Sequence, residues 1–329
     1  MTVYQPGSVP SRPEAVASQP VSLPPRPVFL AGREELLAEL DARLAGGAGA
    51  GPQIVALCGL GGAGKTSVAV EYAHRHLTEV GVAWQLAAEN QAVLAAGFGE
   101  LAAQLGARKR RDPRDPVASV HAVLAAYPAD WLLVLDSAPD QASVRPFLPP
   151  AGRGRVLITS RSALWPSSQA MDVPVLDPQV AAEFLVNRTG DPDRQAALHL
   201  AGELGGLPLA LEQAGAYIQA SGDSLAGYLA LFRRRRTEML ARGEPMGYSE
   251  TVANTWRLAF EHLQQAAPGA VGLLRLLANC APEAIPLPLL LQPRPGLGDQ
   301  LGAEVAPVLV PLLEDELAVR DAIAALRRY

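Results

Sequence analysis

The sequence predicts an α/β fold, with a parallel β-sheet in the first half of the chain and smaller helical domains after it. Four short apolar runs, at 53–58, 81–87, 131–136 and 155–161, are separated by segments with helical spacing. Continuous hydrophobicity is typical of strands that are buried on both faces, and helical connections between strands favour a parallel sheet. A glycine-rich loop also joins the first run to a helix.

A fifth apolar run, at 171–176, completes a predicted five-stranded parallel sheet, in which Pro174 suits an edge position. Residues 1–27 are rich in proline, serine and glutamine and have few large apolar side chains. Because such a segment cannot repay the entropy lost on ordering, we predict a flexible arm there.

After Asp177 the sequence shows no further strand signals and instead shows residues typical of helix boundaries. Asp177 and Asp191 each precede a proline, the pairing typical of an N-cap followed by the first helical residue. Gly190 and Gly222 stand where helices should end. We therefore predict a small helical domain, with further apolar helical faces after it.

Composition narrows the class of protein. The chain has 329 residues and a formal net charge of -5, whereas a protein that binds nucleic acid favours a clustered positive surface. No apolar stretch approaches the roughly 20 residues of a membrane helix, and the beginning of the chain lacks a signal-peptide pattern. These patterns predict a cytoplasmic protein with neither a membrane nor a nucleic acid as its main partner.

The glycine-rich loop carries the strongest functional signal. Residues 59–66, GLGGAGKT, match the P-loop pattern G-x-x-x-x-G-K-[ST] between a strand and a helix. The glycines let backbone amides surround a phosphate, and Lys65 reaches the β and γ oxygens. Thr66 is the expected magnesium ligand and Ser67 the expected α-phosphate contact. The loop predicts a site for ATP or ADP with Mg²⁺.

Two strand ends supply further candidates. Asp136 ends the run WLLVLD, where its carboxylate can hold the magnesium through water; alternatively, it caps the turn that follows. Arg161 ends the run RVLITSR and can meet the γ-phosphate, or it is a solvated charge. The next residue after Asp136 is Ser137, which cannot accept a proton from water as a second carboxylate would. Slow hydrolysis is therefore expected.

With these motifs in place, the chain resembles the NB-ARC domains of the STAND class of P-loop ATPases, and most of all actinobacterial NB-ARC regulators with tetratricopeptide repeats. The segments RPVFLAGRE, CGLGGAGKT, WLLVLD, RVLITSR and LGGLPLALEQAGAYI arrive in the order of that family. The resemblance implies a flexible arm at 1–27, a P-loop domain at 28–177, a helical lid at 178–243 and a winged-helix domain at 244–329. We expect the last domain to be incomplete and sensor repeats to follow it in the full-length protein.

The resemblance also implies residue roles. Backbone atoms near Val28 and Phe29 should contact the adenine, Arg33 should close that edge, and Pro208 should press on the nucleotide from the lid. The predicted catalytic residues are Lys65, Asp136 and Arg161, and the predicted metal ligands are Thr66 and Asp136. The predicted nucleotide contacts are Val28, Phe29, Arg33, Gly61, Gly62, Ala63, Gly64, Lys65, Thr66, Ser67, Pro208 and Leu209.

These expectations favour a nucleotide-dependent switch that hydrolyses ATP slowly and self-associates on activation. One alternative is a turnover ATPase or small-molecule kinase, which needs a catalytic base; Glu89 and Asp140 are weak candidates. Another is a transcription regulator whose winged helix binds DNA.

Overall fold

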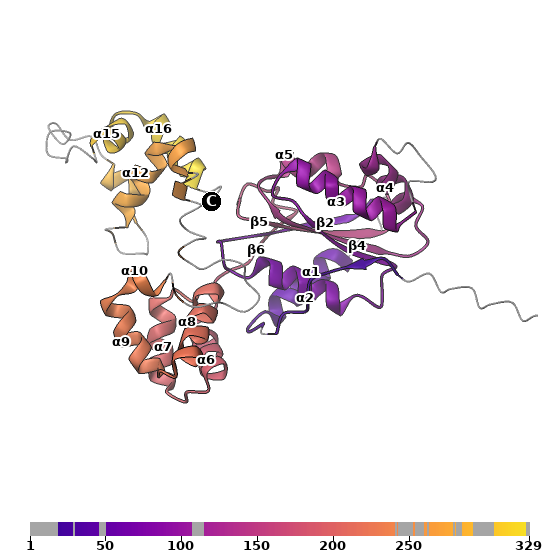
Figure 1. Ribbon diagram of the computed structural model, residues 1–329. Helices are drawn as coiled ribbons and strands as arrows, with labels where there is room; N and C mark the ends of the chain where they lie inside the picture. The colour runs from indigo at the N-terminus through magenta and orange to yellow at the C-terminus, as the bar shows by residue number, and fades with distance from the viewer. Residues whose placement is uncertain are drawn as a thin grey trace, which may run out of the picture.

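The computed structural model describes residues 19–28, 30–45, 51–106, 115–240, 242, 253, 260–261, 263–278, 280, 285–291 and 306–326. Its largest part is a parallel sheet with helices on both faces (Figure 1). The sheet order is β1-β3-β4-β5-β2-β6. The strands are β1 (Val21–Ser22), β2 (Gln53–Cys58), β3 (Val82–Ala87), β4 (Trp131–Ala138), β5 (Gly154–Ser160) and β6 (Ala170–Asp172).

The sheet has six strands among the described residues, so the prediction of five was wrong by one. The extra strand, β1, lies in the segment predicted as a flexible arm, and it pairs Val21 with Ala83 and Ser22 with Trp84 of β3. A strand of two residues is too short to show hydrophobic periodicity in the sequence. Only its pairing with β3, which is distant in the sequence, identifies it as a strand. The predicted run at 171–176 supplies β6, which lies at the opposite edge as expected.

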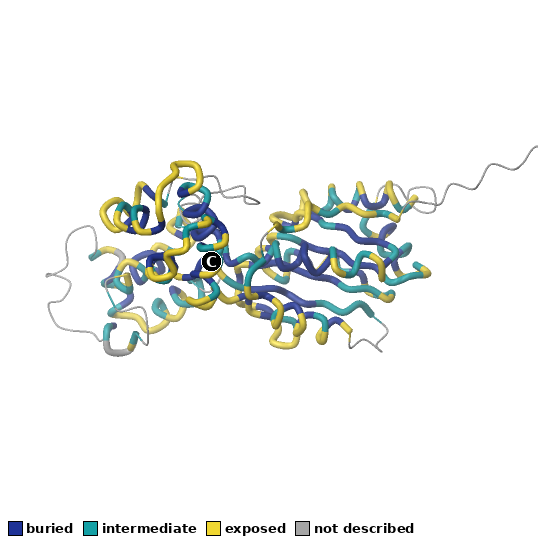
Figure 2. The backbone as a smooth tube through the Cα atoms, turned by 90° about the horizontal axis from the view of Figure 1, so that it is seen from below, coloured by how far each residue is buried: buried dark blue, intermediate teal, exposed yellow. Residues whose placement is uncertain are grey.

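Helices cover both faces of the sheet. In Figure 1, α1 (Glu34–Ala45) and α2 (Lys65–Arg75) lie on one face, and α3 (Gln91–Gln104), α4 (Pro116–Ala125) and α5 (Gln141–Val144) lie on the other. A short 3-10 helix, η2 (Arg145–Phe147), follows α5. Figure 2, which colours each residue by burial, shows many buried residues in this part of the chain. The double covering explains why the strands read as continuous apolar runs.

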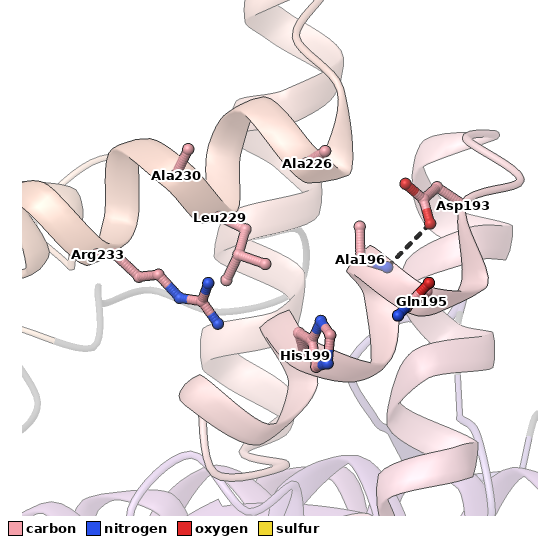
Figure 3. Close-up of a pocket in the computed structure, with 8 residues that line it drawn as sticks. All are labelled: Asp193, Gln195, Ala196, His199, Ala226, Leu229, Ala230 and Arg233. Atoms are coloured by element: carbon pink, nitrogen blue, oxygen red, sulfur yellow. Dashed lines mark hydrogen bonds between the residues drawn. The ribbon is translucent and has the colours of Figure 1, made fainter.

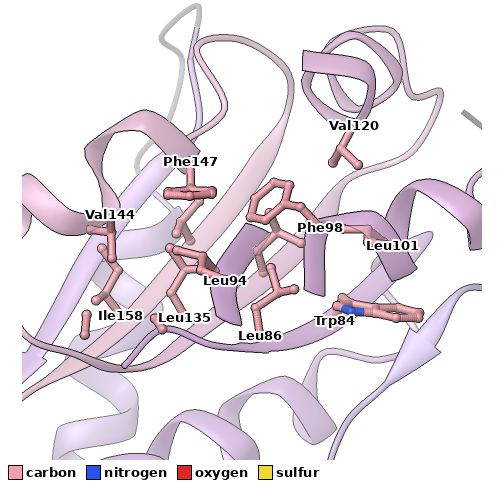
Figure 4. Packing of buried hydrophobic residues seen from close by; sticks show 14 of the residues in the cluster. Trp84, Leu86, Leu94, Phe98, Leu101, Val120, Leu135, Val144, Phe147 and Ile158 are labelled. Atoms are coloured by element: carbon pink, nitrogen blue, oxygen red, sulfur yellow. The ribbon is translucent and has the colours of Figure 1, made fainter. Parts of the chain in front are cut away.

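The core on the α3 side is tightly packed. Figure 4 shows Leu86 of β3 beneath Phe98 of α3 and Trp84 of β3 beneath Leu101, in a cluster that also includes Leu135 and Ile158. Trp131, which begins β4, is fully buried, and a Cβ on Gly154 would come within 2.1 Å of its ring. Glycine at position 154 therefore makes room for the indole in the neighbouring strand.

A helical region follows the sheet. It contains α6 (Pro178–Thr189), α7 (Arg194–Glu203), α8 (Pro208–Ser221), α9 (Leu225–Arg234) and α10 (Arg236–Met239). As predicted, Asp177 caps α6 by accepting a hydrogen bond from the Gln179 amide (2.8 Å). Gly190 ends the same helix in a left-handed conformation.

The prediction that Asp191 caps the next helix was wrong. Asp193 is the cap of α7 and accepts a hydrogen bond from the Ala196 amide (2.9 Å). Asp191 instead accepts from the Asp193 amide (3.0 Å) and from the Leu225 amide at the start of α9 (2.8 Å). The aspartate joins the loop between α6 and α7 to the start of α9, a long-range contact that local sequence does not reveal.

The last part of the described chain contains α12 (Pro268–Leu277), α13 (Leu287–Leu290), α15 (Ala306–Glu314) and α16 (Glu316–Leu326). Helix α12 packs against α15 and α16, around a separate apolar cluster that includes Leu273 and Leu312. The winged-helix assignment of 244–329 stays a prediction. In the described part of the chain, no helix is long and apolar enough to cross a membrane.

Candidate functional site

The glycine-rich loop connects β2 to α2 at the carboxyl end of the sheet, as predicted. Gly62 (φ 83°) and Gly64 (φ 92°) have left-handed backbones, which glycine adopts without the strain that a Cβ would bring. Gly64 is the N-cap of α2, and no side chain caps that helix. Backbone amides at the start of α2 are thus left for an anion, together with the positive end of the helix dipole.

Lys65 is folded back over this loop. Its ammonium group donates hydrogen bonds to the carbonyl oxygens of Gly59 (2.9 Å) and Leu60 (2.8 Å). Burial of the side chain, with the nearby positive charge of Arg161 as a smaller cause, lowers the pKa of Lys65 to about 8. A buried cation that is held against the loop would be stabilised by an incoming anionic ligand.

A hydrogen-bonded network surrounds Asp136 at the end of β4. The Thr66 hydroxyl donates to its Oδ1 (2.7 Å), and the Thr159 hydroxyl of β5 donates to the same oxygen (2.6 Å). The Thr159 hydroxyl in turn accepts from the Ser137 amide (2.8 Å). The two predicted metal ligands, Thr66 and Asp136, therefore do lie together.

Thr159 is the member of this network that the sequence analysis did not single out. It is almost fully buried in β5, two residues before Arg161. The sequence did contain a signal for Thr159. The residue lies near the end of a predicted strand, and the ends of parallel strands meet at the ligand side of the sheet, where Asp136 also lies.

The backbone conformation is irregular directly after Asp136. Ser137 is exposed and has φ 66°, which is uncommon for a residue other than glycine. The pairing of β4 with β5 also shifts register between Leu135 and Ala138. Such irregularities gather at functional sites, where they direct a side chain or a backbone amide.

Arg161 follows the end of β5 and is exposed. Its charge acts on the pKa of Lys65, which places the two cations near each other at the same edge of the sheet. Two neighbouring positive charges repel one another, and an anion bound between them would offset this repulsion.

The start of α8 lies directly against the loop. The Leu209 amide donates to the Gly62 carbonyl oxygen (3.2 Å), and a Cβ on Gly62 would come within 2.8 Å of the Leu209 Cβ. A Cβ on Gly64 would lie 4.0 Å from Pro208. Both predicted lid residues, Pro208 and Leu209, are therefore beside the P-loop.

The residues predicted to contact the adenine, and Arg33 beside them, are only partly described. Val28 is 71% exposed, and Phe29 lies outside the described residues. Arg33 is buried and donates to the carbonyl oxygens of Ala63 in the loop (3.0 Å) and Pro174 (2.7 Å). Arg33 thus connects this edge to the phosphate loop.

The remaining loop candidates differ in burial. Gly61 and Ser67 are half-buried, Ser67 in the first turn of α2, and Ala63 is fully buried.

Neither weak candidate for a catalytic base gains support. The Asp140 carboxylate caps α5 by accepting from the Ser143 amide (2.8 Å). Glu89 is an exposed residue beyond the end of β3.

A separate hollow lies between α7 and α9, away from the loop (Figure 3). Its polar side chains include His199, Asp193, which caps α7, and Arg233, which pairs with Glu203 (3.3 Å). None of the predicted site residues lines it, so we assign it no part in this site.

The fold and the loop together define the class: this is a P-loop ATPase-like α/β fold. Among solved structures, a Walker-type ATPase of Pyrococcus abyssi superposes with a TM-score of 0.52 over 87% of this chain and 89% of its own, at 12% identity. No family model matches the chain.

Two curated relatives narrow this class. The chain is 31% identical over 262 residues to the regulatory protein AfsR of Streptomyces griseus, covering 73% of this chain and 26% of the relative. It is 27% identical over 281 residues to a nucleotide-binding leucine-rich repeat (NLR)-like protein of Hyaloscypha variabilis, covering 72% and 28%. The chain thus spans about a quarter of the length of these relatives. With the ordered motifs, this similarity supports a P-loop ATPase-like domain of the NB-ARC/STAND type.

Proposed function

We propose that the chain binds ATP or ADP with Mg²⁺ on residues 59–67 and acts as a nucleotide-dependent switch. The observation that carries the proposal is the direct contact of the loop with α8, through Leu209 and Gly62 (3.2 Å). A nucleotide held by the loop would touch both the sheet domain and the helical region. Its differential affinity for two arrangements of these parts would then shift their equilibrium.

The residues fit the phosphate chain of a nucleotide. The uncapped start of α2 offers backbone amides, and Lys65 and Arg161 offer positive charge. The two carbonyl oxygens that accept hydrogen bonds from Lys65 stand in for phosphate oxygens, which would attract the ammonium group more strongly because they are charged.

The residues also fit Mg²⁺. The Thr66 hydroxyl and the Asp136 carboxylate are hard oxygen donors that already meet at 2.7 Å. No group of three or more His, Cys, Asp or Glu side chains in the described ranges could hold a metal ion without help. Magnesium ordinarily takes one or two protein oxygens and completes its octahedron with phosphate and water, so this sparse set suits it. When bound, the ion would neutralise charge on the phosphates.

Slow hydrolysis belongs to the proposal. Ser137 follows Asp136 directly, where a second carboxylate would orient water. Glu89 is exposed and Asp140 caps α5, so we assign neither the role of a base. We therefore propose that hydrolysis acts as a timer for the switch. Self-association on activation, and sensor repeats in the full-length protein, are further parts of this proposal.

The proposal is tested with Lys65→Ala. Because the variant removes a buried cation that would contact phosphate, we expect binding of ATP and ADP to weaken by about 1.5 to 3 kcal/mol. Isothermal titration calorimetry measures the change, and Lys65→Arg is the control that keeps the charge. Equal affinities in wild type and Lys65→Ala would remove the central claim.

A further inference from the structure

Buried serine side chains hold the polypeptide on both sides of Arg161. Ser160, the last residue of β5, is fully buried, and Ser162 is almost fully buried. The Ser162 amide donates to the Ser160 hydroxyl oxygen (3.1 Å), which closes a tight turn around Arg161. The Ser162 hydroxyl oxygen accepts from the Leu164 amide in the same way (3.2 Å). The exposed side chain of Arg161 therefore projects from a backbone whose neighbouring residues are buried and hydrogen-bonded.

The Ser160 hydroxyl also ties this turn to the neighbouring strand. It donates to the carbonyl oxygen of Ala138 (2.7 Å), the last residue of β4. Ala138 follows Ser137 directly, and it is paired with Ser160 after the register shift. A hydroxyl can donate one hydrogen bond and accept others, and here a single buried hydroxyl does both. It joins the end of β4 to the residue that follows Arg161.

Thr159 and Ser160 together hold the end of β4. Successive side chains of a strand point to opposite faces, so these two residues contact β4 on different sides. The Thr159 hydroxyl donates to the Asp136 carboxylate (2.6 Å), whereas the Ser160 hydroxyl donates to the Ala138 carbonyl oxygen (2.7 Å). Asp136 and Arg161 are therefore connected through two adjacent residues of β5.

We propose that Ser160 is a positioning residue that fixes the backbone of Arg161 so that its guanidinium contacts the terminal phosphate of ATP. The inference rests on the proposed function and deepens it, because it assigns a residue to the distinction between ATP and ADP. Lys65 is buried and held against the loop, so it serves the phosphates that the loop itself holds. Arg161 is exposed at the same edge of the sheet and supplies charge for a phosphate beyond them.

A fixed backbone matters because the arginine side chain is long. Ordering this side chain on a ligand costs rotamer freedom, and a mobile backbone would add to that cost. The turn at 160–162 is ordered before the ligand arrives, so more of the attraction between guanidinium and phosphate is retained as affinity. ADP has no third phosphate and therefore gains little from this arrangement.

The test compares ADP with an ATP analogue that has a β,γ-imido bridge and resists hydrolysis. Calorimetry in one magnesium buffer measures the affinity of wild type and Ser160→Ala for each nucleotide. We expect Ser160→Ala to weaken binding of the analogue by at least about threefold and to change ADP binding by less than about twofold. Arg161→Gln should give a larger loss of the same kind, about tenfold or more. The double variant should bind the analogue no more weakly than Arg161→Gln, because both changes act on one contact.

Ser162→Ala is the matched control. It also removes the hydroxyl of a buried serine next to Arg161, but it leaves both contacts of the Ser160 hydroxyl in place and removes only the acceptor for the Leu164 amide. It should bind both nucleotides as wild type does. If Ser160→Ala fails to fold, Ser160→Cys replaces it, because a thiol fills the space but donates and accepts only weakly. The same change in preference between the nucleotides is expected.

Several outcomes would overturn the inference. An unchanged preference between the analogue and ADP, in Ser160→Ala or in Arg161→Gln, would show that this contact does not distinguish the nucleotides. An equal loss for both nucleotides, or the same loss in Ser162→Ala, would reduce Ser160 to general support of the fold. If wild type binds neither nucleotide, the proposed function itself fails. If wild type binds both and Ser160→Ala keeps their ratio, only this inference fails.

Discussion

The Leu209 amide donates a hydrogen bond to the carbonyl oxygen of Gly62, so the first turn of α8 rests on the phosphate-binding loop. The close approach requires glycine, because a Cβ at position 62 would come within 2.8 Å of the Leu209 Cβ. The backbone of Leu209 cannot move aside without moving α8. A single added Cβ atom at position 62 would therefore disturb the contact between the loop and the helical region.

We predict that Gly62→Ala separates α8 from the loop. Gly190→Ala is a matched control, because Gly190 also has a left-handed backbone (φ 77°) but a Cβ there would meet nothing within 4 Å. Both substitutions should lower the free energy of unfolding by about 1 kcal/mol through backbone strain. Only Gly62→Ala should increase hydrogen exchange at 207–211. Equal exchange in the two variants would contradict the prediction.

A second prediction concerns the support of Asp136. Thr159→Val keeps the shape of the side chain but removes the donor to Asp136 (2.6 Å) and the acceptor for the Ser137 amide (2.8 Å). Loss of these buried hydrogen bonds should cost about 1 to 3 kcal/mol of stability. It should also raise the Mg²⁺ concentration at half-maximal ADP binding. Thr159→Ser restores the hydroxyl and should recover both values; a Mg²⁺ dependence unchanged in Thr159→Val would remove Thr159 from the site.

Sequence motifs predicted those parts of the site that lie within a single short segment of the chain. The loop at 59–66 has its own spacing, and Asp136 and Arg161 each end an apolar run. Strands that are parallel bring these ends to one edge, so the sequence sufficed to place the residues together.

Long-range contacts account for what was missed. Strand β1 exists through its pairing with Ala83 and Trp84 and is followed by the Arg26–Glu71 ion pair, which joins positions far apart in the sequence. The left-handed backbone of Ser137 likewise accompanies the register shift between β4 and β5, which the sequence does not signal.

A third prediction addresses the rate of hydrolysis. The wild-type protein should hydrolyse ATP more slowly than about 1 per second, the low end of ordinary enzyme rates. Ser137→Asp should raise the rate by supplying a carboxylate. Ser137→Asn is the matched control, since asparagine tolerates the left-handed backbone as aspartate does but accepts no proton from water. A wild-type rate above that limit would favour a turnover enzyme.

The acid stability of the protein gives a fourth prediction. Hydrogen bonding to Arg26, opposed by burial and helped by Arg75, lowers the pKa of Glu71 from 4.5 to about 2. The charged carboxylate therefore stabilises the fold fully above pH 4.5, and this contribution is lost as the pH falls towards 2. Urea unfolding between these pH values should show a steeper loss of stability in wild type than in Glu71→Gln. Parallel curves would exclude Glu71 as the titrating group.

The last prediction tests the switch itself. If the P-loop and the start of α8 touch one nucleotide, the ligand stabilises the arrangement in which both contact it, by as much as its affinities for the two arrangements differ. Hydrogen exchange with saturating ADP should therefore fall at 59–67 and also at 207–211, although these segments lie in different parts of the fold. Lys65→Ala at the same ADP concentration should show smaller changes in both segments, because its affinity is reduced. Protection confined to 59–67 in wild type would mean that the helical region does not sense the nucleotide, and the switch proposal would then fail even though the chain binds ADP.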